Sequence, residues 1–449
     1  MNAQLLGDLT LALALLVGLL AVGTALGRSL GVHQWGIPEA LLAGTLGLLI
    51  APGGGLLALI PVRVIAIWDQ LPLILLTLVF GTLLVGKPLP RLNGLLRPLG
   101  AQVLLALTLA FGQYLVASLA VLLVLGPLLH VSPVMACLIE VAYEGGHGSA
   151  AAMGPTYERL GVEGGQALGL AMATVGLLAS TLVGGLVVVI ARARGWLMPA
   201  AAAPAANAGP AVAAEAADAV LGERISRWLV NLALVGIAVG IGCGLMALLQ
   251  LLAARTGGGF ATVIDALPVF PLALIGSLLV RLVLERLGAG ELACTKVQSR
   301  IATVSADLLI VAATACLDLA LLAQDWLPLT VLALIGLLWN LAVVLLLARR
   351  SLPAPWFERG ILEFGQATGV AASGLLLLNM ADPNDQSEAL TPFSIKQLLL
   401  QPLLAGGVIT VMAPLAIAGW GLPVWTGVCL GLTVLWIVLA LLLVQRQPG

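Results

Sequence analysis

Charged, aromatic and histidine residues are scarce in this chain. Of its 449 residues, 9% are charged, 4% are aromatic and three are histidine. A soluble domain usually has roughly a quarter of its residues charged, so this composition excludes an ordinary soluble globular protein. Its 20 basic and 21 acidic residues nearly balance and form no basic stretch, which gives nucleic-acid binding no support.

Cysteine is also rare, and no two cysteines have the CxxC spacing of a metal or redox site. All five lie in or beside apolar segments, where cysteine usually packs as a small apolar side chain. The chain has no G-x-x-x-x-G-K-[ST] stretch, so we do not expect it to drive transport by binding ATP itself. The prediction is a protein that is not an enzyme and needs no cofactor.

Apolar residues are abundant, at 61% of the chain, with a mean hydropathy of +1.13. The apolar runs reach about 20 residues, enough to cross a hydrocarbon core roughly 30 Å thick. They lack the alternation of a β-barrel, so we predict helices. The predicted spans are residues 9–27, 36–52, 69–86, 102–129, 166–191, 226–252, 267–285, 302–323, 327–348, 397–418 and 423–444.

The basic residues indicate how these spans are oriented, since positive charge collects in cytoplasmic loops. Two glycine-rich pieces, 133–154 and 360–381, are apolar but are not counted as spans. If both enter the membrane and return, and the N-terminus is outside, 17 of the 20 Lys and Arg residues lie inside. A full crossing by either piece would move every later loop to the other side and remove this bias. The count therefore predicts two re-entrant loops and a cytoplasmic C-terminus.

The arrangement predicts an inverted repeat, the recurrent plan of secondary transporters. Each re-entrant loop follows four spans and precedes one, and the two enter from opposite sides. We predict an all-α polytopic membrane protein made of two inverted repeats of five transmembrane helices. The expected regions are an N-terminal repeat (1–191), a cytoplasmic linker (192–224), a C-terminal repeat (225–418), and an extra helix with a tail (419–449).

Each re-entrant loop has a glycine-rich break, at 145–148 in the first and at 365–369 in the second. Two half-helices of about ten residues rise roughly 15 Å each, so they reach only the midplane. Free N–H groups at half-helix N-termini suit a carboxylate, and unwound carbonyl groups suit Na⁺. The alternative is close helix contact through glycine. Two symmetrically placed breaks favour a binding site.

Polar side chains within the spans are a second indication of a site, because lipid disfavours them. Gln113 and Asn340 lie in the fourth and ninth spans, which are mirror partners under the repeat, and we expect both at the substrate. Candidate sodium ligands are Asp307, Glu144 beside the first break, and Thr174 in the next span. Asp307 could equally pair with a basic neighbour.

The stretch GGHGSAAAMGPTYERLGVEGGQALGLAMATVGLLASTLVGG (145–185) resembles the signature of the bacterial sodium/glutamate symporters. The resemblance extends over nearly the whole chain, and the first loop is its specific part. It implies Na⁺-coupled glutamate uptake by a homodimer in the bacterial inner membrane, built from two inverted five-helix repeats with opposed re-entrant loops.

Carried over by position, the resemblance implies that Gly145, Gly146, His147, Gly148 and Ser149 form the first binding loop. Gly365 and Gly369 fall in the second, with Gln366 and Thr368 between them. The family usually has Gly-x-Gly-x-Thr-Pro there, whereas this chain has Gly-Gln-Ala-Thr-Gly-Val. Because the second loop supplies half of the site, this departure leaves the identity of the solute open. His147 is open to three roles: proton carrier, ligand donor or loop hydrogen bond.

Na⁺-coupled symport of glutamate or a related small anionic solute is thus the predicted function. One alternative is cation/proton antiport with Asp307 as the titrating carboxylate. A remote one is an intramembrane hydrolase, because residues 27–31 read G-x-S-x-G. That serine lies at a predicted helix end beside Arg28, and not at a strand-to-helix elbow.

Overall fold

The computed structural model describes all of the chain except residues 1–2, 32–37, 53–56, 87–95, 199–220, 259–260, 262–263, 266, 318, 384–385 and 446–449. Most of the predicted linker 192–224 lies outside the described residues. Throughout the described part the structure is helical, with no strand. Ser29 lies within helix α1 and donates to the Leu26 carbonyl oxygen, so the strand-to-helix elbow of a hydrolase is not formed there.

The helices are, in chain order, α1 (Ala3–Leu30), α2 (Glu39–Ile50), α3 (Val62–Trp68), α4 (Leu71–Thr82), α5 (Leu96–Ala120), α6 (Gly126–Leu129), α7 (Leu138–Tyr143), α8 (Gly146–Arg159), α9 (Gly165–Ala193), α10 (Leu221–Thr256), α12 (Phe270–Arg286), α13 (Thr295–Ala315), α14 (Leu319–Gln324), α15 (Trp326–Ala342), α16 (Arg349–Ser351), α17 (Trp356–Ala381), α18 (Leu390–Leu400), α19 (Val408–Trp420) and α20 (Leu422–Gln445).

Nine helical stretches in the described part are long and apolar enough to cross a membrane. Eight of them fall on predicted spans, and the ninth, Trp356–Ala381, contains the second predicted re-entrant piece. Five of the predicted spans need correction. The span 267–285 forms α12, which has 17 residues and is not among the nine, and 302–323 ends as a helix at Ala315, with the short α14 after it. The span 36–52 forms only the short helix α2, and 69–86 is extended towards the N-terminus by α3. The span 397–418 is two helices, α18 and α19, separated by a non-helical segment at 401–407. Pro402, Gly406 and Gly407 interrupt the helix there.

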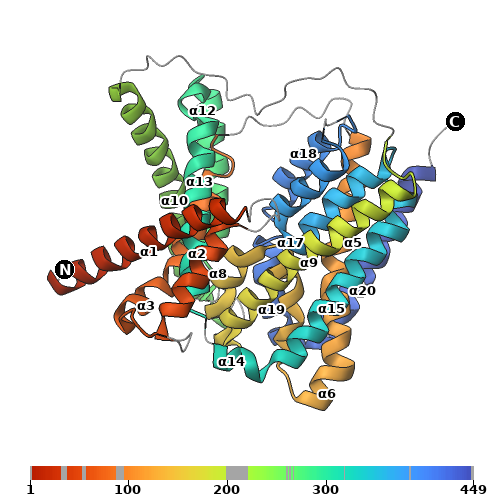
Figure 1. Ribbon diagram of the computed structural model, residues 1–449, viewed down its shortest axis with the longest axis horizontal. Coiled ribbons are helices and arrows are strands. Elements are labelled where there is room, and N and C mark those ends of the chain that lie inside the picture. The colour runs from red at the N-terminus through yellow and green to blue at the C-terminus, as the bar shows by residue number, and fades with distance from the viewer. Residues whose placement is uncertain are drawn as a thin grey trace.

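The helices form two bundles that do not follow the order of the chain (Figure 1). In the first bundle α1–α4 pack with α10, α12 and α13. In the second, α5 and α7–α9 pack with α15 and α17–α20. Each bundle therefore combines helices from both predicted repeats. Contacts between the bundles are made mainly by α8, which touches α4 and α13.

Both predicted breaks are present in the second bundle, slightly displaced from the predicted positions. The first interrupts the helix at Glu144 and Gly145, so that His147 and Gly148 already belong to α8. The second lies within α17, where Gly369 and Val370 leave helical geometry. Gly365, Gln366 and Thr368 remain in the helix that precedes it.

The chain doubles back at each break. A Cβ atom at Gly365 would collide with the backbone of Gly374, although nine residues of straight helix would separate them by about 13 Å. Likewise α7 and α8 pack against each other, and Tyr157 near the end of α8 belongs to the same buried cluster as Cys137 just before α7. Both segments are therefore helical hairpins.

A matching irregularity precedes each hairpin. A π-helical segment follows α5 at Val121–Leu125, and another follows α15 at Val343–Ala348. Such wide turns are rare and usually mark functional regions.

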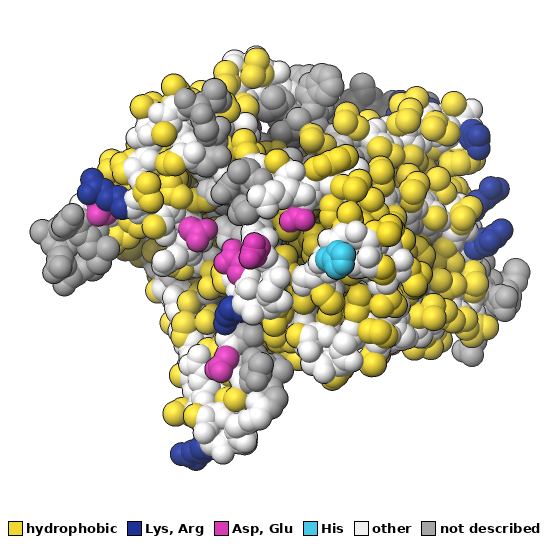
Figure 2. Space-filling view, turned by 90° about the horizontal axis from the view of Figure 1, so that it is seen from below, with side chains coloured by type: hydrophobic (Ala, Val, Ile, Leu, Met, Phe, Trp, Pro, Cys, Tyr) yellow, Lys and Arg dark blue, Asp and Glu magenta, His cyan; other side chains and the backbone are white. Residues whose placement is uncertain are grey.

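Hydrophobic side chains cover most of the face in Figure 2, where acidic side chains gather near the middle and basic ones towards the edges.

Candidate functional site

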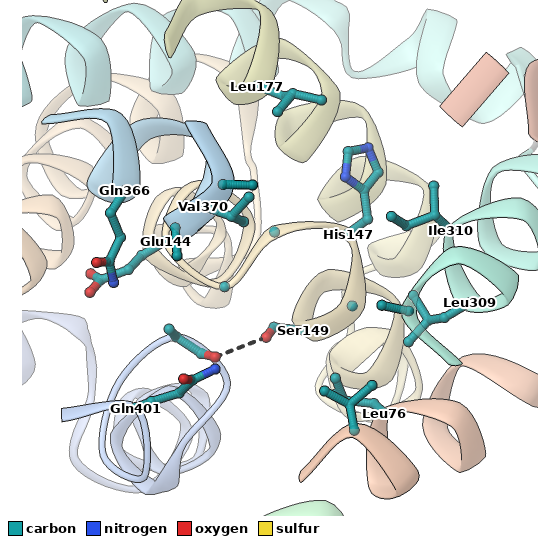
Figure 3. Close-up of a pocket in the computed structure, with 18 of the residues that line it drawn as sticks. Leu76, Glu144, His147, Ser149, Leu177, Leu309, Ile310, Gln366, Val370 and Gln401 are labelled. Atoms are coloured by element: carbon teal, nitrogen blue, oxygen red, sulfur yellow. Dashed lines mark hydrogen bonds between the residues drawn. The ribbon is translucent and has the colours of Figure 1, made fainter. Parts of the chain in front are cut away.

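A cavity of about 320 Å³ lies where the two bundles meet. Its lining divides sharply by bundle. The first bundle contributes only apolar side chains, from α4 and α13, together with Pro38 just before α2. The polar lining residues all belong to the second bundle: Glu144, His147, Ser149, Gln366, Gln397 and Gln401. Figure 3 shows how several of these side chains converge from the first break, from α17 and from the segment that follows α18.

The two breaks touch each other beside this cavity. Gly146 has φ +66°, and Val370 has φ +67°, a region that non-glycine residues rarely adopt. A Cβ atom at Gly146 would collide with Cγ1 of Val370. Glycine is therefore required at 146 for two reasons: its backbone angle, and the close approach of the second break.

Both breaks also begin a half-helix at the cavity. Gly146 and His147 open α8, and Ala371 and Ala372 follow the break in α17; all four line the cavity. The first N–H groups of a helix lack intrahelical partners, and they give that end a partial positive charge. Two such ends facing one cavity provide donors for anionic groups.

Glu144 places a carboxylate in the same cavity. Its side chain is 6% exposed, and among the described residues its Oε2 has no hydrogen-bond partner. A buried ionised carboxylate needs a cation or several donors to offset its lost hydration. Of the three predicted sodium ligands, Glu144 alone lines the cavity.

His147 is hydrogen-bonded to Thr174, one of the predicted sodium ligands. Its Nε2 lies 3.0 Å from the Thr174 hydroxyl oxygen, and that hydroxyl donates to the Leu170 carbonyl oxygen. With the hydroxyl proton placed on the Leu170 carbonyl, Nε2 of His147 is the donor, and Nδ1 of the neutral ring is left as an acceptor. Thr174 therefore orients the imidazole, and its oxygen is already engaged.

A third break, at 401–407, closes one side of the cavity and was not predicted. Ser149 donates to the Ala405 carbonyl oxygen at 3.2 Å (Figure 3). The buried Glu140 accepts hydrogen bonds from the Ala405 N–H, the Thr410 hydroxyl and the Tyr114 hydroxyl, at 3.0, 2.9 and 2.6 Å. Glu140 thus fixes this segment, and Gln401 and Ala405 line the cavity.

Gln113 and Asn340 lie close together, as their mirror positions predicted, but behind the second break and not in the lining. Gln113 Nε2 donates to Asn340 Oδ1 at 3.1 Å. Both amides donate to the Ala367 carbonyl oxygen, at 2.6 and 2.9 Å, and Asn340 also donates to the Thr368 hydroxyl oxygen. They satisfy the Ala367 carbonyl group, which lies where the break ends the helix and carbonyl groups lose their helical partners.

Gly369, at the second break, packs against Ser180 of α9. A Cβ atom at position 369 would lie 2.7 Å from the Ser180 hydroxyl oxygen. Asp307 lies in α13 outside the cavity lining, which gives the antiport alternative no support.

Sequence reasoning missed Gln397 and Gln401, because it took 397–418 as one continuous span. The Pro402 and Gly406-Gly407 signals within that run could have revealed them.

A family model described as sodium/glutamate symporter matches residues 5–352, well over half of the sequence. The chain belongs to the sodium/glutamate symporter family. This is a family of transporters and not of enzymes, and it makes the apolar helices those of a multi-pass membrane protein. No curated protein and no solved structure matches the chain.

The match to the symporter family covers only part of the site. It includes the first break, α8 and α9, and it ends at residue 352, before α17. The second and third breaks, with Gln366, Gln397 and Gln401, therefore lie beyond the matched region. The family match therefore supports the part of the site around the first break, and it does not extend to the parts around the second and third breaks.

Proposed function

We propose that the protein is a Na⁺-coupled symporter of glutamate or a closely related acidic amino acid. The observation that carries the proposal is the cavity shared by two half-helix N-termini and the carboxylate of Glu144. An acidic amino acid has two carboxylates and one ammonium group. The helix ends suit the carboxylates, and Glu144 suits the ammonium group or a coupling Na⁺.

The arrangement of the two bundles indicates how such a solute would move. All polar lining groups belong to the second bundle, whereas the first presents Leu76, Val79, Phe80, Leu309 and Ile310. A solute bound mainly by one body can travel with it, because the apolar wall forms no hydrogen bonds that must break. We infer that the second bundle moves against the first during transport.

The inverted repeat and the orientation are part of the same proposal. The paired π-helical segments and the two hairpins support two related halves, each with a re-entrant loop. The bias of basic residues supports an outer N-terminus and a cytoplasmic C-terminus. The predicted topology places Lys396 near the inner surface, but its side chain is buried in an ion pair. The remaining basic residues assigned to the inside still outnumber those assigned to the outside. The family further suggests a homodimer in the bacterial inner membrane.

The decisive experiment is uptake of radiolabelled glutamate into proteoliposomes, with and without an inward Na⁺ gradient. A panel of unlabelled amino acids and dicarboxylates competes for uptake. We expect uptake only with the gradient, and strong competition only by acidic amino acids. Uptake that does not respond to Na⁺ would refute the coupling, and competition by neutral solutes alone would refute the substrate class.

A further inference from the structure

A buried ion pair lies directly behind the cavity wall formed by Gln366. The Lys396 ammonium of α18 is 1% exposed and donates to Glu363 Oε2 of α17 at 2.8 Å. It also donates to Gln366 Oε1 at 2.8 Å and lies 4.4 Å from the centre of the Phe393 ring. The other carboxylate oxygen of Glu363 accepts from Gln102. The charges of the pair are thus matched, and neither residue lines the cavity.

The ion pair determines which way the Gln366 amide faces. An ammonium group has three donors and no acceptor, so only the amide oxygen can face it. The Gln366 NH₂ group is thereby directed away from Lys396. Within the described part of the chain this NH₂ group donates no hydrogen bond, and Gln366 lines the cavity. Figure 3 shows the Gln366 and Glu144 side chains on the same side of the cavity.

The backbone that follows the second break presents further donors on this side of the cavity. The helix that resumes after the second break begins with Ala371 and Ala372, both in the lining, and its first N–H groups have no helical acceptor. A carboxylate, which only accepts, can satisfy the Gln366 NH₂ group and a backbone N–H together. A carboxamide accepts through one oxygen only, so both donors must converge on that oxygen, and its own NH₂ group adds a further donor to a wall that already presents donors.

We propose that Lys396 and Glu363 are positioning residues that hold Gln366 as an obligatory donor, and that this donor selects a carboxylate over a carboxamide in the bound solute. The proposal rests on the proposed function, since it names how the same cavity separates an acidic amino acid from its amide. Fixing the amide matters because a free glutamine side chain can rotate and present its oxygen instead.

The test is a neutral replacement of the pair, Lys396→Met with Glu363→Gln. Removing both charges avoids the unpaired buried charge that a single change would leave. Proteoliposome uptake gives KM for glutamate and the inhibition constant for glutamine. We expect their ratio to move towards glutamine by about tenfold, the scale of one hydrogen bond to a charged group. The maximal rate should stay within about threefold, since no group that lines the cavity has been removed.

A second variant guards against misfolding of the first. Gln366→Leu keeps the ion pair and removes the donor, so we expect the same loss of discrimination with a raised KM for glutamate. The control is the ion pair of Arg281 and Glu285 in α12 of the first bundle, 2.8 Å apart, in which the arginine is buried and the glutamate reaches the surface. Arg281→Met with Glu285→Gln should leave the ratio unchanged, and size-exclusion profiles report folding of every variant.

The outcomes separate the two proposals. An unchanged ratio in a folded Lys396→Met/Glu363→Gln variant, with normal Na⁺-driven uptake by the unaltered protein, overturns the positioning inference alone. An equal loss of discrimination in the Arg281/Glu285 control also overturns it, because the effect would then be general. If the unaltered protein takes up no acidic amino acid, the proposed function fails and the inference fails with it.

Discussion

The two bundles differ in regularity and in chemistry at the surface where they meet. The first bundle presents unbroken helical segments of α4 and α13 with apolar side chains to the cavity. The second presents three breaks and every polar lining group, and it contains the buried charges Glu140, Glu363 and Lys396. A regular apolar wall needs no specific partner, whereas broken helices must satisfy their free backbone groups. The difference teaches that the second bundle carries the groups that bind the solute, whereas the first bundle supplies the apolar surface against which it packs.

The largest effect is expected where two breaks of the second bundle touch. Gly146→Ala places a Cβ against Val370 and strains a left-handed residue, which together cost roughly 3 kcal/mol, enough for about a 100-fold loss of uptake. Glutamate uptake measures it. The control is Gly240→Ala in α10 of the first bundle, where a Cβ meets nothing within 4 Å. Gly146→Ala with Val370→Ala should recover part of the loss; normal uptake by Gly146→Ala alone would contradict the contact.

Linking the bundles should also stop transport. Ala151 of α8 and Ala313 of α13 share one buried cluster across the boundary. In a background without the five native cysteines, oxidation of the pair Ala151→Cys/Ala313→Cys should reduce uptake in proportion to crosslink yield, and reduction should restore it. A pair within the second bundle, Ala191→Cys/Ala348→Cys, serves as control. Full uptake by crosslinked protein would refute relative movement of the bundles.

The two buried glutamates of the first hairpin should respond differently. Glu144→Gln removes a carboxylate with an unpartnered oxygen, so we expect about a tenfold higher Na⁺ concentration for half-maximal uptake, with thermal stability retained. Glu140→Gln replaces an acceptor of three hydrogen bonds and should lower stability by roughly 1–3 kcal/mol. Na⁺ titration of uptake and thermal unfolding measure the two effects. A loss of stability in Glu144→Gln together with a changed Na⁺ dependence in Glu140→Gln would contradict the roles assigned to the two glutamates.

The smallest effect is expected on the apolar wall. Ile310→Val removes one methylene from the first bundle's lining, worth about 0.8 kcal/mol, so KM for glutamate should rise by at most about fourfold. Gln401→Leu, on the polar side, should raise it by more than about tenfold, because an amide that lines the cavity and can hydrogen-bond to the solute is lost. Competition uptake at several glutamate concentrations gives both values. A larger increase in KM for Ile310→Val than for Gln401→Leu would contradict the assignment of solute binding to the second bundle.

Much of this molecule could be predicted from the sequence, and the failures have physical causes. Long apolar runs predict helices because only helices satisfy the backbone in lipid, and the glycines at 145–148 predict the first break. The third break was missed because its flanking runs are as apolar as a continuous span. Gln113 and Asn340 were predicted at the substrate, since a buried amide looks alike in sequence whether it binds a ligand or a backbone carbonyl. Only the packing shows that both donate to Ala367.

The bonds of Glu140 have a consequence for biogenesis. Its donors Ala405 and Thr410 follow it by 265 and 270 residues. During synthesis α7 enters the membrane long before α19 exists, so this carboxylate lacks two of its three donors for most of translation. An unsatisfied acidic group in lipid is unfavourable, and it marks a nascent chain as incomplete. We expect chains truncated before Ala405 to be degraded by membrane quality control, so that this one carboxylate reports whether assembly is finished.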